Sequence, residues 1–294
     1  MRPMTPAISC RLAVLLILAG TTTARGDEPA LFTLATFNIH HAEGADGKLD
    51  LDRVAGVVRE ADIVAFQEVD VRFGARSRDE DQAARLGVIL GRAVAFGPNL
   101  VRDGGRYGVA VVSKFPILST RNIPLPRSPG REQAEPRGLL EVEVKLPDGG
   151  PLRVYATHLA HDSVEDRKRQ VAAIRAVVGR PEAAGTPWVL LGDFNFRPES
   201  PEYARLTGRE PSEPNPDPGP LVGMADSWAK VGRGPGATIR LDRPEHAHRI
   251  DYIFVSADLA PGLLDARVDT ETRASDHQPV FVRLRRPATP APRP

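Results

Sequence analysis

The feature that most constrains this chain is a series of short apolar segments, separated by turns and by a few stretches with helical periodicity. The segments that read as strands are Leu31–Asn38, Asp62–Gln67, Tyr107–Ser113, Ile117–Ile123, Leu139–Leu146, Leu152–His158, Trp188–Leu191, Arg249–Ser256 and Val280–Leu284. Helical spacing follows Asp50 and recurs over Asp79–Leu90 and Asp162–Val178. Since no linker separates two sets of elements, we expect one α/β domain of two packed sheets with helices outside.

Polar side chains end or interrupt six of these apolar segments. They are Asn38, Glu68, His158, Asp193 with Asn195, Asp251, and Asp276 with His277. Burying any of these groups without a partner costs a few kcal/mol. We therefore expect the strand ends to converge, so that the groups satisfy one another around a cation or a substrate.

Each of these residues also has a structural interpretation. Asn38 could form a turn, Glu68 could be a solvated strand end, and Asp193 with Asn195 could close a strand as an Asx turn. Asp251 has apolar neighbours on both sides, which favours burial beside a charged or polar partner.

Composition limits the classes of substrate. The chain has 294 residues, 41% hydrophobic and 26% charged, which is typical of a globular protein. Lys and Arg number 39 against 38 Asp and Glu, so a net charge of +1 gives no general attraction to nucleic acid or anionic lipid. Aromatic residues make up 5%, too few to indicate a base-stacking surface.

The N-terminus has the pattern of a signal peptide over residues 1–24. Arg2 and Arg11 flank a basic start, an apolar run covers Leu12–Ala19, and Thr22 and Ala24 place small residues at a cleavage site. A retained membrane anchor is the alternative, but it would need about 20 apolar residues. The pattern predicts export to the periplasm or the medium.

Cleavage would change the chemistry available to the chain. The single cysteine, Cys10, leaves with the signal, so the mature chain would have no disulfide, thiolate nucleophile or cysteine-bound zinc. Its net charge would be −1, from 37 basic and 38 acidic residues. We expect a catalytic domain over residues 27–286 and a Pro/Ala-rich tail over 287–294.

Seven short motifs, in order along nearly the whole mature chain, resemble the endonuclease/exonuclease/phosphatase superfamily. They are Thr36-Phe-Asn38-Ile-His, Gln67-Glu68-Val-Asp, Tyr107-Gly-Val-Ala-Val-Val-Ser, Thr157-His158-Leu, Gly192-Asp193-Phe-Asn195, Arg249-Ile-Asp251-Tyr-Ile and Ser275-Asp276-His277. The pairs Arg76-Ser77 and Asp81-Gln82 look most like a secreted bacterial branch. The resemblance implies a four-layered α/β sandwich, with two central mixed sheets flanked by helices.

The resemblance also implies a metal site. Glu68 would bind a divalent cation, with Asn38 and Asp276 close to it. Oxygen ligands of this kind suit Mg²⁺, or Mn²⁺, rather than zinc. His40 stands where several family nucleases carry an acidic second ligand, so one or two ions remain open.

The remaining implied roles concern proton transfer and phosphate binding. His277 would be the base or a phosphate-stabilising imidazolium, held by Asp251, and His158 would be the second imidazole. Asp193 and Asn195 would position the water or the phosphate, and Asp193 is the alternative base. Two candidate phosphate contacts, which could also be ordinary exposed arginines, are Arg76 and Arg137.

The expected function is metal-dependent hydrolysis of phosphate esters, foremost as a phosphodiesterase on a small-molecule or lipid head-group phosphoester. A secreted nuclease acting on DNA or RNA is the alternative within the enzyme class. An inactive relative that only binds phosphorylated ligands is the alternative outside it. We expect a monomer without a stable membrane span.

Overall fold

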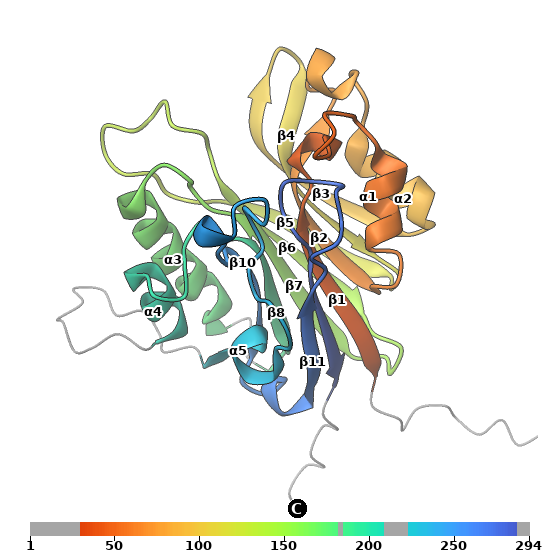
Figure 1. Cartoon of the computed structure of the whole chain (residues 1–294). Helices are drawn as coiled ribbons and strands as arrows, with labels where there is room; N and C mark the ends of the chain where they lie inside the picture. Colours follow the sequence, from red (N-terminus) through yellow and green to blue (C-terminus); the bar gives the residue numbers. More distant parts are fainter. Residues whose placement is uncertain (1–29, 182–184, 209–222, 287–294) are drawn as a thin grey trace, which may run out of the picture.

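The computed structural model describes residues 30–181, 185–208 and 223–286. Within these ranges, two six-stranded sheets pack against each other and helices cover their outer faces (Figure 1). The predicted four-layered α/β sandwich is confirmed. The predicted signal peptide at 1–24 and tail at 287–294 lie outside the described residues, so the domain boundaries stay predictions.

Each sheet contains one parallel pair among antiparallel neighbours. The first sheet has the order β11 (Leu263–Val268), β12 (Val280–Arg285), β1 (Leu31–Asn38), β2 (Ile63–Val71), β4 (Gly105–Ser113) and β3 (Ala93–Arg102). The second has the order β5 (Ile117–Pro124), β6 (Gly138–Lys145), β7 (Pro151–His158), β8 (Trp188–Asp193), β10 (Asp251–Ser256) and β9 (Met224–Asp226). The parallel pairs, β1–β2 and β7–β8, are central in both sheets.

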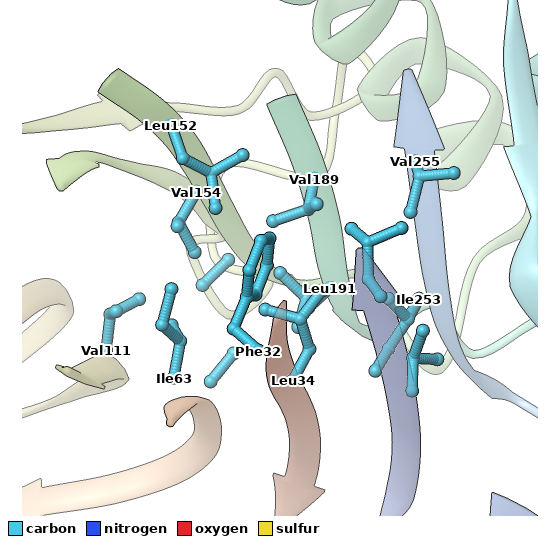
Figure 2. Close-up of a cluster of buried hydrophobic side chains, with 14 of the residues drawn as sticks. Phe32, Leu34, Ile63, Val111, Leu152, Val154, Val189, Leu191, Ile253 and Val255 are labelled. Atoms are coloured by element: carbon cyan, nitrogen blue, oxygen red, sulfur yellow. The ribbon is translucent and has the colours of Figure 1, made fainter. Parts of the chain in front are cut away.

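The main core lies between the sheets. Figure 2 shows Phe32, Leu34 and Ile63 of the first sheet facing Val154 and Leu191 of the second. Because side chains alternate along a strand, the intervening residues of β1, Ala35 and Phe37, pack on the opposite face. We call the face that carries Phe32 and Leu34, and its counterpart in the second sheet, the inter-sheet face.

Helices cover the two outer faces. The helices α1 (Leu51–Val57) and α2 (Gln82–Leu90) lie on the first sheet, and α3 (Val164–Val178) and α4 (Pro201–Thr207) lie on the second (Figure 1). A fifth, α5 (Ser227–Val231), packs at the β10–β11 end. Side-chain caps start the four covering helices, as expected for Asp and Ser at N-caps: Asp50, Asp81, Ser163 and Ser200.

Several sequence expectations need correction at the element ends. The helix expected over Asp79–Leu90 begins at Gln82, because Arg78 and Asp79 adopt left-handed backbone angles and Asp81 caps the helix. Strand β3 was not expected, since Gly97 and Pro98 interrupt its apolar pattern and fall beside a register shift. The short elements α4, β9, α5 and β11 were not expected either.

The described residues contain no helix that is long and apolar enough to cross a bilayer.

Candidate active site

The predicted polar strand ends converge because they continue the alternation of the core. On β1, Asn38 follows Phe32 and Leu34 in steps of two, so it points between the sheets. On β8, Asp193 continues from Val189 and Leu191. The same count puts the side chains of His158 on β7 and Asp251 on β10 on the inter-sheet face.

Strand register then places these residues side by side. Within the second sheet, Asp193 is the partner of both His158 and Asp251. In the first sheet, Asn38 is the partner of Gln67 on β2. All five of these side chains are buried.

Glu68 reaches the site through a bulge, not at a strand end as the sequence suggested. Strand β2 continues to Val71, and its register against β4 shifts between Phe66 and Val69. Glu68 has φ of 59°, a left-handed conformation that costs a non-glycine residue on the order of 1 kcal/mol. The extra residue turns both Gln67 and Glu68 toward the inter-sheet face, while Phe66 and Val69 pack beneath the helices.

Asn38 joins the two sheets at the site. Its Nδ2 donates to Glu68 Oε1 at 3.0 Å and to Asp193 Oδ2 at 3.0 Å, and its Oδ1 accepts from the backbone N–H of His40 at 3.1 Å. The turn that the sequence left open is therefore present. It fixes the amide orientation, so that both Asn38 Nδ2 protons face carboxylates.

The imidazole part of the site centres on Asp193. His277 Nδ1 is 2.9 Å from Asp251 Oδ2, and its Nε2 is 3.8 Å from Asp193 Oδ2. His158 Nε2 is 3.4 Å from the same Asp193 oxygen. His277 therefore lies between two buried carboxylates, with Nδ1 donating to Asp251 and Nε2 directed at Asp193.

Burial and charge give these groups different pKa shifts. Burial, together with the Asp251 carboxylate, raises the pKa of Asp193 to about 7. Burial alone would lower the pKa of His277, but the Asp251 carboxylate outweighs it and raises that pKa to about 10. Burial and the nearby Arg137 guanidinium lower the pKa of His158 well below its usual value. One imidazole is thus held charged and the other neutral.

Asn195 forms the turn that was its structural alternative, and this turn holds Asp193. Its backbone N–H donates to Asp193 Oδ1 at 2.9 Å, and its Nδ2 donates to the Leu159 carbonyl at 3.1 Å. Asn195 has φ of 52°, which an Asn tolerates better than most residues. Its predicted role toward water or phosphate stays a prediction.

Asp276 lies at the mouth of the site. Its side chain is 57% exposed, and its Oδ1 is 4.0 Å from His40 Nδ1. Ser275, which was not among the predicted site residues, donates from Oγ to the Asn38 carbonyl at 2.8 Å and accepts from the His277 N–H at 3.2 Å. Its place in the Ser275-Asp276-His277 motif was the signal that could have identified it.

The two predicted phosphate arginines differ in environment. Arg76 forms a paired contact with buried Asp70, at 2.8 and 2.6 Å, and lies over the rings of Phe73 and Tyr107. Asp70 and Tyr107 were not predicted as site residues. Tyr107 is buried close to Glu68, and burial raises its pKa well above the usual range.

Arg137 is buried, so its alternative interpretation as an exposed arginine is wrong. It is 4% exposed, its Nη1 is 2.9 Å from Glu135, and its Nη2 is 3.3 Å from His161 Nδ1. Its Nε is buried without a hydrogen-bond partner among the described residues. An unsatisfied guanidinium N–H beside His158 fits a contact to an anionic ligand.

Two groups of side chains could hold a divalent cation. Glu68, with Asp276 at the mouth, offers carboxylate oxygens, which suit Mg²⁺ or Mn²⁺. The Asn38 amide oxygen accepts from the His40 N–H, so Asn38 could add only its remaining lone pair. The ligand atoms of Asp193, Asp251 and His277 lie within 4.8 Å of one another and could also bind a metal. His277 Nδ1 is already hydrogen-bonded to Asp251 Oδ2, and Mg²⁺ and Mn²⁺ prefer oxygen ligands to nitrogen. We therefore favour the oxygen donors around Glu68 as the metal site.

The fold and this site define a phosphoesterase-type hydrolase of the four-layered α/β class. Residues 35–277 match the endonuclease/exonuclease/phosphatase family. The chain belongs to this family, whose members are phosphoesterases and in general depend on a divalent metal.

Known proteins similar to this chain cover most of its length. The uncharacterized protein YbhP of Escherichia coli K12 is 27% identical over 270 residues, which cover 86% of this chain and 96% of YbhP. The structure of an endonuclease/exonuclease/phosphatase protein from Beutenbergia cavernae has 28% identity and a TM-score of 0.70, covering 88% of this chain and 73% of that one. The mannosyl-6-phosphatase Bt3783 of Bacteroides thetaiotaomicron has 21% identity and a TM-score of 0.67, covering 85% and 98%. At that identity, Bt3783 supports the fold alone.

Proposed function

We propose that the protein is a divalent-metal-dependent phosphodiesterase acting on a small-molecule or lipid head-group phosphoester. The observation that carries this proposal is the junction at Asp193 Oδ2, where Asn38, His158 and His277 meet. The junction places oxygen donors for a cation next to a pair of imidazoles, which is the combination that phosphoester hydrolysis needs.

The side chains divide the work as follows. Asn38 and Glu68, with Asp276, would hold the ion, which when bound supplies neutralisation of negative charge on the phosphoryl oxygens. The Asp251 carboxylate orients His277, so that Nε2 faces the reacting centre. Arg137 and the imidazole of His158 lie next to each other and would donate to a non-bridging phosphoryl oxygen.

Asp193 Oδ2 is placed to accept the proton of the attacking water. His277 Nε2, 3.8 Å away, is the alternative base, but it can accept a proton only after losing its own, which its raised pKa disfavours near neutral pH. Asn195 fixes Asp193 through Oδ1 and leaves Oδ2 directed into the site. Asp193→Asn keeps the hydrogen-bonding shape while removing the carboxylate. A general base acts in its deprotonated form, so loss of the acidic limb of the pH–rate profile in Asp193→Asn, but not in His277→Gln, would assign the base to Asp193.

The near-neutral charge of the chain supports a small substrate over long nucleic acid. The predicted mature chain has a net charge of −1 (37 basic, 38 acidic residues), which gives little general attraction to a polyanion. The similarity to Bt3783, a mannosyl-6-phosphatase, is a reason to include sugar monoesters among the substrates tested.

The test is a panel of substrates incubated with purified protein and Mg²⁺ or Mn²⁺. The panel contains aryl monoesters and diesters, a sugar phosphate, phosphoinositides, sphingomyelin and plasmid DNA, and Asp193→Ala protein is the control for contaminating activity. Turnover of a small or lipid-borne diester that is abolished by EDTA supports the proposal. Cleavage of plasmid alone would make the protein a nuclease, and absence of any turnover would favour a phospho-ligand-binding role.

We also propose that the protein is exported and that its signal is removed after Ala24. Arg2, Arg11 and the apolar run over Leu12–Ala19 support this proposal. The intact mass of the protein recovered from the periplasm or medium of an expressing bacterium tests it. A mass that retains residues 1–24 would contradict cleavage.

A further inference from the structure

A cavity of about 630 Å³ opens beside Asn195. Six of its nine lining residues carry basic side chains: His161, Arg197, Arg240, Arg243, His246 and His248. The other three are Asn195, Ile239 and Ile250, so no carboxylate lines the cavity within the described residues.

This basic cavity lies next to the backbone segment that carries His277. Ile239 forms an isolated antiparallel bridge with His277 and another with His248. The residues adjacent to the Ile239–His277 bridge are also hydrogen-bonded to each other, since Gln278 N donates to the Thr238 carbonyl at 2.7 Å. Arg240 therefore directly follows the residue that pairs with His277, and Asn195, whose backbone N–H holds Asp193, lines the cavity.

The positive charge in the cavity is neutralised only in part, since Arg243 pairs with Asp242 at 3.6 Å and His246 with Glu245 at 3.8 Å. Arg197 and Arg240 are both exposed, and neither pairs with a carboxylate in the described residues. The nearest polar contact of Arg197 is His248 Nδ1, at 3.5 Å, which is another basic side chain. Arg249, by contrast, is paired with Asp226 at 2.9 Å.

The pKa shift of His248 agrees with this excess of positive charge. Its pKa is lowered, first by burial and then by the charges of Arg197 and Arg240. An anion placed among these groups would relieve that repulsion and form charge-assisted hydrogen bonds.

A second cavity, of about 710 Å³, provides a contrast on the other side of the same loop. Arg240 and Arg243 line it as well, but there they are accompanied by Asp242, Glu271 and Asp276. Its mixed charge gives no preference for an anion. The two cavities therefore differ in charge. The one at Asp276 is lined by carboxylates as well as arginines, and the one at Asn195 is lined by basic side chains without a carboxylate.

We propose that the basic cavity binds a second anionic group of the substrate, so that the preferred substrates carry a phosphate or a carboxylate beyond the scissile phosphoester. This inference rests on the proposed phosphoesterase function and specifies its substrate class. Arg197 and Arg240 would bind the second anion, with His161 and His248 at the sides of the cavity.

The test compares matched anions as inhibitors of bis(4-nitrophenyl) phosphate hydrolysis. The anions are ethyl phosphate, ethane-1,2-diol and butane-1,4-diol bisphosphates, and 3-phosphooxypropanoate. Since a charge-assisted hydrogen bond contributes about 10- to 100-fold in affinity, the best doubly anionic compound should bind at least about tenfold more tightly than ethyl phosphate, after correction for its equivalent phosphates. If only the bisphosphates bind more tightly than ethyl phosphate, the cavity selects a second phosphate. If 3-phosphooxypropanoate gains as much affinity as the bisphosphates, the cavity selects any second negative charge.

Two variants test whether the higher affinity for doubly anionic compounds comes from the basic cavity. In Arg197→Gln/Arg240→Gln, the ratio of the affinities for the doubly and singly anionic compounds should fall to near one. In Arg273→Gln, which removes an exposed arginine from the mixed-charge cavity, the ratio should be unchanged. A ratio near one in the unaltered protein, or a ratio that survives the double substitution, would overturn the inference.

Calorimetric titration of the same anions, with Mg²⁺ present, separates the two proposals. Absence of hydrolysis together with preferential binding of the doubly anionic compounds would remove the phosphodiesterase function but keep the anion site. Hydrolysis without such preference would do the reverse.

Discussion

The two sides of the site are built in the same way but hold different chemistry. On the first sheet, Asn38 and Glu68 present an amide and a carboxylate, which we call the metal half. On the second sheet, His158, Asp193 and Asp251, together with His277, form the imidazole half. The single direct hydrogen bond described between the halves, from Asn38 to Asp193, joins them.

The comparison shows how one strand geometry supports two roles. Asn38, His158, Asp193 and Asp251 continue the inter-sheet alternation of their strands, whereas a bulge turns Glu68 inward and the loop before β12 supplies His277. The metal half is partly open and reaches solvent at Asp276, while the imidazole half is almost fully buried. Burial and the buried Asp251 carboxylate give the imidazole half its large pKa shifts, and exposure suits the metal half to exchange ions with solvent.

We expect the largest loss of activity from the metal half. Glu68→Ala should lower kcat/KM by about three orders of magnitude or more, because charge neutralisation by a divalent ion is worth several kcal/mol. Initial rates with Mg²⁺ and with EDTA measure the loss. The EDTA-treated unaltered protein should show the same residual rate as the variant.

The same variant tests whether the ion sits in this half. Mg²⁺ at about 100 times its Kd should stabilise the unaltered protein by about 2.7 kcal/mol, measured as a rise in Tm. Glu68→Ala should lose this rise, whereas Glu271→Ala, which removes a carboxylate from the outer loop, should keep it. A rise that persists without Glu68 would move the ion toward the Asp193, Asp251 and His277 group.

We expect the next largest loss from the imidazole half. His277→Gln should lower kcat by about 10²- to 10⁴-fold, the usual contribution of a positioned acid or base. It should also lower the stability, because Asp251 is left buried without its cationic partner. Adding Asp251→Asn to His277→Gln should recover stability but not activity, and both forms should retain the Tm rise with Mg²⁺. If the His277 variants lost the Mg²⁺-induced rise in Tm, residues of the imidazole half would also be ligands of the ion.

A smaller effect, on the charge of His277, should follow from Asp251→Asn. Because the Asp251 carboxylate is the group that raises the pKa of His277 to about 10, its removal should lower that pKa and leave the imidazole neutral at a lower pH. NMR titration of the imidazole signals measures the shift. Asp276→Asn is the matched control, since Asp276 contributes least to the raised pKa. Kinetically, kcat should fall more than KM rises, and a change confined to KM would contradict an orienting role.

Much of the imidazole half could be predicted from alternation alone. His158, Asp193 and Asp251 stand at even steps from apolar residues of the core, and the printed sequence contains those steps. The parallel and antiparallel pairing that makes Asp193 the common neighbour follows from the strand order, which neither alternation nor the predicted sandwich specified.

Glu68 could not be placed in this way. Regular alternation from Ile63 and Ala65 would put Glu68 on the outer face, and only the bulge after Phe66 reverses it. The burial of Arg137 and the bridge from Ile239 to His277 escaped prediction for a related reason. Both depend on loops packing against distant strands, which local periodicity does not encode.

The smallest effect we expect is at Asn195, where two terms nearly cancel. Asn195→Gly removes the left-handed strain, on the order of 1 kcal/mol, but loses the hydrogen bond to the Leu159 carbonyl, worth about 0.5–1.5 kcal/mol. Asn195→Ala loses the bond and keeps the strain, so it should be about 1 kcal/mol less stable than the Gly variant. Urea unfolding measures the difference. If both variants lose activity equally, the side chain contacts the substrate or water; if Asn195→Gly is fully active, Asn195 only shapes the turn that holds Asp193.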